Sequence, residues 1–347
     1  MIISSIILSD LYEDFFSALI LTAAFLSCSQ ENVDQNPPAQ DTDAEAPKSE
    51  EQWEDVSDQY GELPEYIKVY KSPSKLQGKK AIAYIAEADM TKATWDIWSI
   101  NDPNLEGCND AFKTPSKVYS EGSWPIVINA GFFYSSGGKN YSSSLAVRNS
   151  EVLACNINYA SEDWKTIFYP TRAALLENEE GQFDACWTYK TWDNHYMYPI
   201  PSPNKWIAPP APTPSANYPE GGEVLHAKTA IGGGPVLIDK GVVKNTYVAE
   251  LFYGDSGIDP TGNQPRTAIG VTEDKKMIIF VCEGRQMTQG VKGLSTSDVA
   301  NVLLELGCVE AINLDGGGSS CMLVNGRETI KLSDGTQRAV ASTIMLR

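Results

Sequence analysis

The chain contains 347 residues, of which 42% are hydrophobic, so it is long enough to bury one large core or two modest ones. Its net charge of −18 at pH 7, with no basic stripe anywhere, excludes nucleic-acid binding. With only His195 and His226 present, a three-histidine zinc centre is excluded, and the lack of any Cys-x-x-Cys spacing argues against a thiolate zinc site.

The first 28 residues are typical of a signal peptide. Residues 15–26 are mostly apolar but too few to span a bilayer. Ser27 and Cys28 follow and resemble the cleavage box of a bacterial lipoprotein, in which Cys28 is the acylated residue. Acidic residues, rather than Lys or Arg, precede the apolar stretch, and the alternative is an uncleaved hydrophobic N-terminus. We therefore expect a cell-envelope lipoprotein, periplasmic or on the outer-membrane surface, that contacts the membrane only through its lipid anchor.

Residues 29–62 differ in composition from the rest of the chain. They contain eleven acidic residues, a single lysine and three prolines, with few large apolar groups. Such a segment cannot bury enough surface to offset the entropy of ordering it. It is predicted to be a disordered acidic tether, followed by one catalytic domain over residues 63–347.

Beyond residue 62, short apolar stretches alternate with turn residues. Strands are predicted at residues 81–86, 125–128 and 339–346. Hairpins are predicted where two such stretches flank turn residues, at 145–147 with 152–155, 173–176 with 183–187, 236–238 with 242–243, and 267–272 with 277–282. A further hairpin is expected at Asn325-Gly326, the strongest short turn signal in the chain.

A strand–helix–strand unit is predicted over residues 277–314. The continuous apolar stretch 277–282 suits a strand buried on both faces. Residues 295–306 then offer capping residues and apolar positions at helical spacing, and Gly307 suits the end of a helix. Residues 309–314 form the second strand, so a βαβ crossover with parallel strands is expected. One crossover helix among many hairpins predicts an α+β fold with a mixed sheet.

Both strands of this unit end in residues that can carry chemistry. The second stops at Asp315, and three glycines follow, which suit a close approach of backbone N–H groups to an anion or ligand. The first ends at Glu283 and Arg285. Because parallel strands end at one edge of a sheet, we expect two carboxylates and an arginine to gather there. The alternative is a tight β-turn that begins at Asp315.

Residues 313–320 resemble the signature of the phosphodiester glycosidase family. Segments 129–133, 233–237, 266–270 and 283–285 resemble further family motifs in the same order along the chain. One position departs from the pattern, because many members have Asp where this chain has Glu283. The resemblance implies hydrolysis of a sugar-1-phosphodiester, small or part of a glycan, at the anomeric C1–O bond. The products would be an N-acetylglucosamine-like sugar and a phosphate monoester, with no cofactor and no catalytic metal.

The chemistry of individual residues and their places in the chain suggest their roles. Asp315 is expected to act as nucleophile or base and Glu283 as the second carboxylate. Arg266 is expected to stabilise the departing phosphate, which needs positive charge more than a proton. Substrate-binding residues are expected at Asn129, Thr267, Arg285, Gly316, Gly317, Gly318, Ser319 and His226.

Two functions from other classes remain open. The protein could be a non-catalytic glycan-binding surface lipoprotein that uses its aromatic residues. It could instead be a metal-dependent phosphodiesterase with the metal on Asp315 and Glu283. The sugar, the aglycone, retention or inversion, and the oligomeric state also stay open. So do the pairing of Cys108, Cys155, Cys186, Cys282, Cys308 and Cys321, and whether the proline-rich residues 199–219 rim the site or pack as a surface insertion.

The anchor is tested by Cys28→Ala. Because acylation would occur on this thiol, the substitution should move the protein from the detergent-soluble membrane fraction to the soluble fraction. A wild-type protein that is already soluble and unacylated by mass spectrometry would contradict the lipoprotein prediction.

Overall fold

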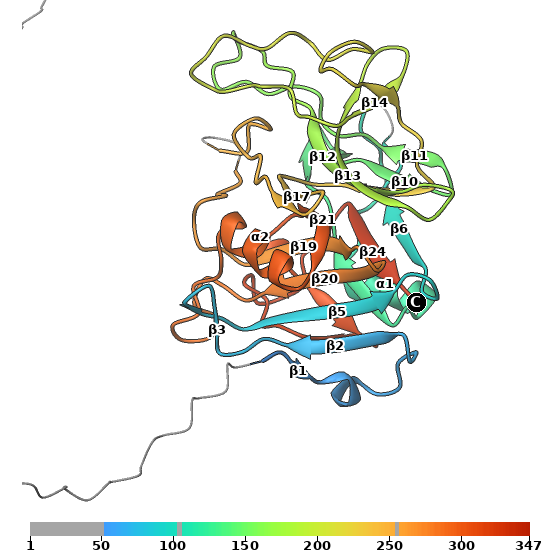
Figure 1. Cartoon of the computed structure of the whole chain (residues 1–347), viewed down its shortest axis with the longest axis vertical. Helices are drawn as coiled ribbons and strands as arrows, with labels where there is room; N and C mark the ends of the chain where they lie inside the picture. Colours follow the sequence, from blue (N-terminus) through green and yellow to red (C-terminus); the bar gives the residue numbers. More distant parts are fainter. Residues whose placement is uncertain (1–51, 103–105, 254–256) are drawn as a thin grey trace, which may run out of the picture. The chain divides into compact units, whose positions relative to one another are not determined.

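Short strands are the main secondary structure of the fold (Figure 1). The computed structural model describes residues 52–102, 106–253 and 257–347. The expected signal peptide, Cys28 and most of the expected acidic tether lie outside these residues. Among the residues described, no helix is long and apolar enough to cross a membrane.

The largest sheet has eight strands and carries the predicted strand–helix–strand unit. In spatial order its strands are β1 (Glu54–Asp55), β2 (Ile67–Lys71), β5 (Ala83–Asp89), β20 (Lys276–Cys282), β19 (Arg266–Thr272), β21 (Cys308–Asn313), β17 (Val236–Asp239) and β18 (Val242–Val243). Neighbouring strands are antiparallel throughout.

Two further sheets are also antiparallel. The seven-stranded sheet contains β11 (Glu151–Ala154), β10 (Ala146–Arg148), β16 (Thr229–Gly232), β12 (Arg172–Glu177), β13 (Phe183–Lys190), β14 (His195–Tyr198) and β15 (Glu223–Val224). The five-stranded sheet contains β23 (Arg327–Glu328), β22 (Met322–Val324), β7 (Ile126–Asn129), β24 (Ser342–Leu346) and β6 (Trp95–Ser99). Two small hairpins complete the strands, β3 (Lys75–Leu76) with β4 (Lys79–Lys80) and β8 (Phe133–Ser136) with β9 (Lys139–Ser142).

One hydrophobic cluster joins the three large sheets. It includes Ile279 from the eight-stranded sheet, Ile128 from the five-stranded sheet and Leu175 from the seven-stranded sheet, all fully buried. A second cluster lies on the other face of the eight-stranded sheet, where Val299 and Leu303 of α2 (Thr296–Glu305) cover Phe280 and its neighbours. Figure 1 shows α2 against this sheet. The eight-stranded sheet is therefore buried on both faces, which explains the continuous apolar stretches in its sequence.

The α+β class agrees with the structure in outline, but the expected mixed sheet is wrong, because the three large sheets are antiparallel. The hairpin between β19 and β20 has a loop of only three residues, 273–275, so β19 must pair with β20. The chain then passes through α2 and adds β21 on the far side of β19. The two strands that flank α2 are both antiparallel to β19 and therefore run in the same direction, but β19 separates them and they do not pair.

The local predictions fare better than the sheet topology. The five expected hairpins are present, and Gly307 follows α2 with a left-handed φ of +86°. A short helix that we did not predict, α1 (Pro115–Gly122), begins after Thr114, whose hydroxyl accepts the N–H of Lys117. Disulfides, which the sequence permitted, are not formed by Cys108, Cys186, Cys282, Cys308 or Cys321 within the described residues.

The predicted boundary of the tether at residue 62 is wrong. β1 and the single 3-10 turn Ser57–Tyr60 lie within the expected tether. Val56 between them is 2% exposed, and its N–H donates to the carbonyl of Val69 in β2. Composition averaged over thirty-odd residues does not register one buried valine and a short strand pairing, so the ordered start of the domain was missed.

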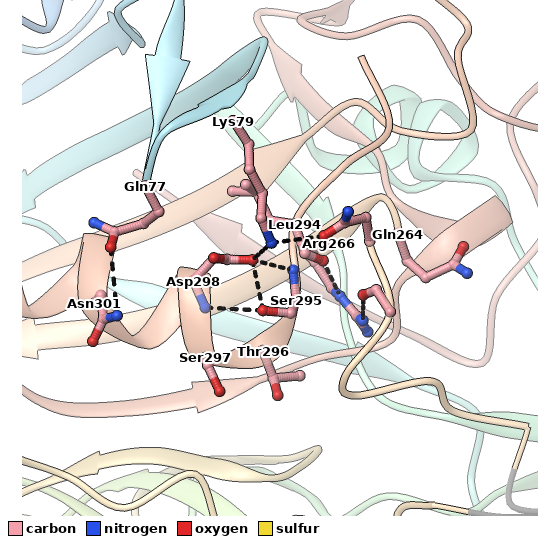
Figure 2. A network of polar contacts seen from close by, with 12 residues as sticks. Gln77, Lys79, Gln264, Arg266, Leu294, Ser295, Thr296, Ser297, Asp298 and Asn301 are labelled. Carbon is pink, nitrogen blue, oxygen red and sulfur yellow. Dashed lines mark hydrogen bonds and ion pairs between the residues drawn. The ribbon is translucent and has the colours of Figure 1, made fainter. Parts of the chain in front are cut away.

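The N-terminus of α2 is tied to the β3–β4 hairpin (Figure 2). Ser295 and Asp298 form a capping box, in which each side chain accepts the backbone N–H of the other residue. The Asp298 carboxylate also binds the Lys79 ammonium at 2.6 Å. Burial alone would raise the pKa of Asp298, but the hydrogen bonds from Lys79 and Ser295 lower it below its ordinary value.

Asp298→Ala should lower the free energy of unfolding at pH 7 by about 1–2 kcal/mol, because it removes half of the capping box and the Lys79 pair. A lowered carboxyl pKa stabilises the fold above the unfolded value and loses that effect as the pH falls through the folded value. The difference from wild type should therefore shrink in denaturant titrations below about pH 4. Asn301→Ala, on the exposed face of the same helix, is the control. An equal loss in both variants would contradict a capping role.

Candidate active site

Asp315 lies in the connection from β21 of the eight-stranded sheet to β22 of the five-stranded sheet. Its backbone N–H donates to the carbonyl of Ala130 over 2.9 Å, and the next residues form a single 3-10 turn, Gly317–Ser319. Burial raises the pKa of Asp315 to about 6, although the Ser319 hydroxyl, the Arg338 guanidinium and the N–H of Gly316 act to lower it. The carboxyl group can therefore exchange a proton near neutral pH.

Asn129 holds the backbone beside this carboxylate. Its Nδ2 donates to the carbonyl of Asp315 over 2.7 Å. Its Oδ1 accepts the Thr267 hydroxyl at 2.9 Å and the N–H of Cys321 at 3.0 Å. Asn129 and Thr267 are both fully buried. Contrary to expectation, these two residues position Asp315 from behind, because their polar atoms are already bonded to protein atoms.

A cavity of about 500 Å³ opens beside Asp315. Aromatic side chains form much of its lining: Phe132, Phe133, Tyr134, Tyr159, Trp164, Trp206 and Phe252. Trp206 belongs to the proline-rich segment, so part of that segment forms a wall of the cavity. The polar side chains of the lining include Asp315, Arg172, Arg338 and, toward solvent, Glu162.

Arg172, at the start of β12, is a cation in the wall of this cavity. Its guanidinium lies 4.2 Å from the centre of the Phe252 ring, and the residue is 7% exposed. Burial lowers the pKa of Arg172 to about 10, against the effect of the Glu250 carboxylate, so it stays charged at neutral pH. Its Nε has no hydrogen-bond partner in the part of the chain that the structure describes. Arg172 belongs to none of the recognised motifs, and only its place before an apolar strand could have drawn attention to it.

The fully buried Glu250 organises the wall behind Arg172. Its carboxylate accepts hydrogen bonds from the N–H groups of Ala173 and Val236, from Trp187 Nε1 and from the Thr246 hydroxyl, at 2.6–3.1 Å. Burial raises its pKa, and these hydrogen bonds and Arg172 oppose that effect. The Gly-Gly-Pro motif is explained here, because a Cβ on Gly234 would collide with the Phe252 ring.

A second cationic group in the cavity lining is Arg338. Arg338 Nη1 approaches the Ser319 hydroxyl at 3.4 Å, while its Nε and Nη2 donate to Asp334. Arg285, expected to bind substrate, lies beside Gly317 with its Nη1 3.8 Å from the same Asp334 carboxylate. A Cβ on Gly318 would overlap both Asp334 and Arg338. At Gly318, therefore, the glycine makes room for an ion pair, and a ligand is not needed to explain it.

Arg266 and Glu283, two of the three expected catalytic residues, are not in the cavity lining. Arg266 is 3% exposed and donates to the carbonyls of Leu294 and Gly262 at 2.9 Å and to that of Asp259 (Figure 2). Glu283 is 4% exposed, and its Oε1 accepts the N–H of Lys331 at 3.1 Å. Side chains alternate along β19, so Arg266 shares a face with Ala268, which packs in the cluster beneath α2.

His226 is also separate from Asp315. It lines a different hollow of about 770 Å³ on the seven-stranded sheet, which contains none of the other expected site residues. Among the residues that the structure describes, no group of three or more His, Cys, Asp or Glu side chains could hold a metal ion.

Comparison with known proteins identifies the family. Residues 124–347 match the family model described as phosphodiester glycosidase. The chain belongs to this family. The phosphodiester glycosidase match contains Asn129, Arg172, Glu250, Asp315 and Arg338, whereas β1–β6 lie outside it.

The individual relatives of this chain are distant. A stretch of 82 residues is 38% identical to the SPbeta prophage-derived uncharacterized protein YomE of Bacillus subtilis (strain 168), and it covers 24% of this chain and 12% of that protein. A hypothetical protein from Synechocystis superposes with a TM-score of 0.53 and 16% identity over 81% of this chain and 62% of the other. The catalytic domain of zebrafish N-acetylglucosamine-1-phosphodiester alpha-N-acetylglucosaminidase, auto-inhibited by its pro-peptide, superposes with a TM-score of 0.53 and 17% identity. The match covers 86% of this chain and 87% of the other. These two structures show a shared fold.

Asn129→Ala should lower the free energy of unfolding by about 3 kcal/mol, because it leaves three buried hydrogen-bonding groups on other segments without their partner. Chemical denaturation measures the loss, and Asn217→Ala, at an exposed amide, should change stability by less than about 0.5 kcal/mol. An Asn129→Ala protein of wild-type stability, altered only in KM for its substrate, would make Asn129 a substrate ligand instead.

Proposed function

We propose that this protein hydrolyses a sugar-1-phosphodiester at the anomeric C1–O bond and releases a sugar, of the N-acetylglucosamine type, and a phosphate monoester. One observation carries the proposal. A carboxyl group whose pKa is raised to about 6 lines an aromatic cavity together with two arginines, inside the segment that matches the phosphodiester glycosidase family. The named activity of the zebrafish relative is in keeping with this substrate class.

The arginines suit the leaving group. When C1–O breaks, the electron pair stays with an oxygen of the phosphate monoester, which is a weak base and needs little protonation. It does carry negative charge, so cations in a partly desolvated cavity stabilise it. Arg172 lies buried against Phe252, and its Nε lacks a protein partner within the described residues. Arg338 is more exposed and close to Ser319. Both line the cavity, so together they can bind the non-bridging phosphate oxygens.

The aromatic lining suits the sugar. Pyranose rings present C–H faces that pack on aromatic rings, and these rings also exclude water from a developing oxocarbenium ion. Tyr134 is a fixed platform, because its ring stacks on Tyr141 with centroids 4.8 Å apart and planes 3° apart. Phe132 and Phe252 pack together deeper in the cavity, with their centroids at 5.5 Å.

Asp315 would act in its ionised form. It either attacks C1 directly or removes a proton from the water that does so. The second carboxylate that the sequence assigned to Glu283 is not needed for a leaving group of this kind. Glu162, the other carboxylate in the lining, is exposed at the rim.

Replacing Asp315 tests the assignment. Asp315→Asn should lower kcat/KM on the order of 10³-fold or more. In the wild type, kcat/KM should rise with pH and level off above about 6, since the base works only when ionised. A carboxyl pKa raised by burial favours the fold at low pH, and this contribution is lost between about pH 4 and 6. At pH 8, Asp315→Asn should therefore melt no lower than wild type.

Glu283→Gln is the matched control. It should keep the inflection near pH 6, whereas a loss of that inflection would return Glu283 to the catalytic machinery. Full activity in Asp315→Asn would end the assignment of Asp315.

The bond that breaks is decided by turnover of methyl N-acetylglucosamine-1-phosphate in ¹⁸O-water. We expect the label in the anomeric hydroxyl of the sugar, read early because free sugars exchange this oxygen slowly, and none in methyl phosphate. Label in the phosphate with sensitivity to a chelator would indicate a metal-dependent phosphodiesterase. Binding without turnover of any sugar phosphodiester would indicate a glycan-binding protein.

A further inference from the structure

A second hollow of about 280 Å³ adjoins the cavity beside Asp315. The two share Glu162 and Trp206 as a common wall. Six of the nine residues that line the second hollow are apolar: Phe168, Trp206, Ile207, Ala208, Pro209 and Pro210. Most of them come from the proline-rich segment, for which the cleavage chemistry provides no use.

This hollow has a rigid floor. The Trp206 indole donates from Nε1 to the carbonyl of Tyr253 at 3.0 Å, and its backbone N–H donates to the Tyr253 hydroxyl at 2.9 Å. The Phe168 ring packs edge-on against it, with centroids at 5.2 Å. Prolines at 209 and 210 restrict the backbone that follows. The surface is therefore formed before any ligand arrives.

Two of the three polar residues that line the hollow, Asp163 and Thr166, are bonded within their own loop. Asp163 Oδ1 accepts the N–H groups of Lys165 and Thr166 at 2.8 Å, and the Thr166 hydroxyl contacts Asp163 Oδ2 at 3.4 Å. Their hydrogen-bonding groups are therefore partly occupied by this loop. By contrast, Ile207 is 86% exposed here, and Trp164 at the adjoining cavity rim is 76% exposed. Exposed apolar side chains around a groove are typical of a surface that an apolar ligand covers.

We propose that this hollow binds an apolar aglycone, an alkyl or prenyl chain esterified to the phosphate of the substrate. The inference rests on the proposed function. With the phosphate between Arg172 and Arg338, its second ester substituent leaves the cavity past Trp206 and lies on Ile207. Water adds its oxygen to C1, the C1–O bond breaks, and the alkyl group leaves as an alkyl phosphate monoester. The substrate class is a sugar joined by a phosphodiester to a lipid-like alcohol.

Two measurements with a series of alkyl chains test this. The first compares kcat/KM for methyl, butyl and octyl esters of N-acetylglucosamine-1-phosphate, below their micelle concentrations. Because each buried methylene favours binding, we expect a rise of at least about tenfold from methyl to octyl. The second titrates methyl phosphate, octyl phosphate and mannose 6-phosphate by calorimetry, and it requires no turnover. Octyl phosphate should bind at least about tenfold more tightly than methyl phosphate.

Ile207→Ser should abolish most of the increase in kcat/KM and in affinity between the methyl and octyl compounds. Because Ile207 is exposed, misfolding would not explain such a loss. Ile200→Ser, at a 50% exposed position of the same segment outside both hollows, should leave both increases unchanged. Equal values across the alkyl series, or tighter binding of mannose 6-phosphate that depends on Ile207, would overturn the inference while turnover itself stands. Affinity that depends on chain length and on Ile207 without any hydrolysis would uphold the apolar site and overturn the proposed reaction.

Discussion

The hydrogen bonds of the Asn129 amide are the constraint on which the site depends. One buried side chain at the end of β7 joins the start of β19, the backbone of Asp315 and the segment that leads into β22. These segments come from two different sheets. Hydrogen bonds in such a dry place are strong, and leaving any one group unpaired is costly. The position of the Asp315 carboxylate is thus coupled to the packing of both sheets.

Glu250 holds the wall of the cavity behind Arg172 in a similar way. It connects the start of β12, the start of β17 and the indole of Trp187 through one carboxylate. A buried carboxylate is tolerated because four donors and the nearby Arg172 charge compensate for its desolvation. Arg172 comes from the seven-stranded sheet, and Asp315 from the link between the other two sheets. The cavity is therefore a product of how three sheets pack, although each sheet alone is an ordinary antiparallel one.

The features that could be predicted from sequence are those set by neighbouring residues. Asn325-Gly326 dictates its hairpin, the capping residues at Ser295 begin α2, and Asp315 ends a buried strand. Arg172 and Glu250 could not be found, because their roles arise from contacts with residues that are distant in sequence. The position of Arg266 outside the cavity lining could not be predicted for a related reason. This arginine alternates with Thr267 along β19, and the sequence does not tell which of the two faces α2. The prediction of a mixed sheet was wrong because a helix that connects two strands in sequence does not show whether another strand separates them in the sheet.

The cysteines of the described domain have a chemical consequence. Burial raises the pKa of Cys282 and Cys308 to about 12, and that of Cys186 well above its ordinary value. The thiolate is the reactive form, so these sulfurs are almost inert toward oxidants and alkylating reagents while the domain is folded. Rates of thiol labelling at Cys282 and Cys308 would then report the opening of the eight-stranded sheet beneath α2, and those at Cys186 the opening of the seven-stranded sheet. The buried thiols thus serve as probes for local unfolding in both sheets.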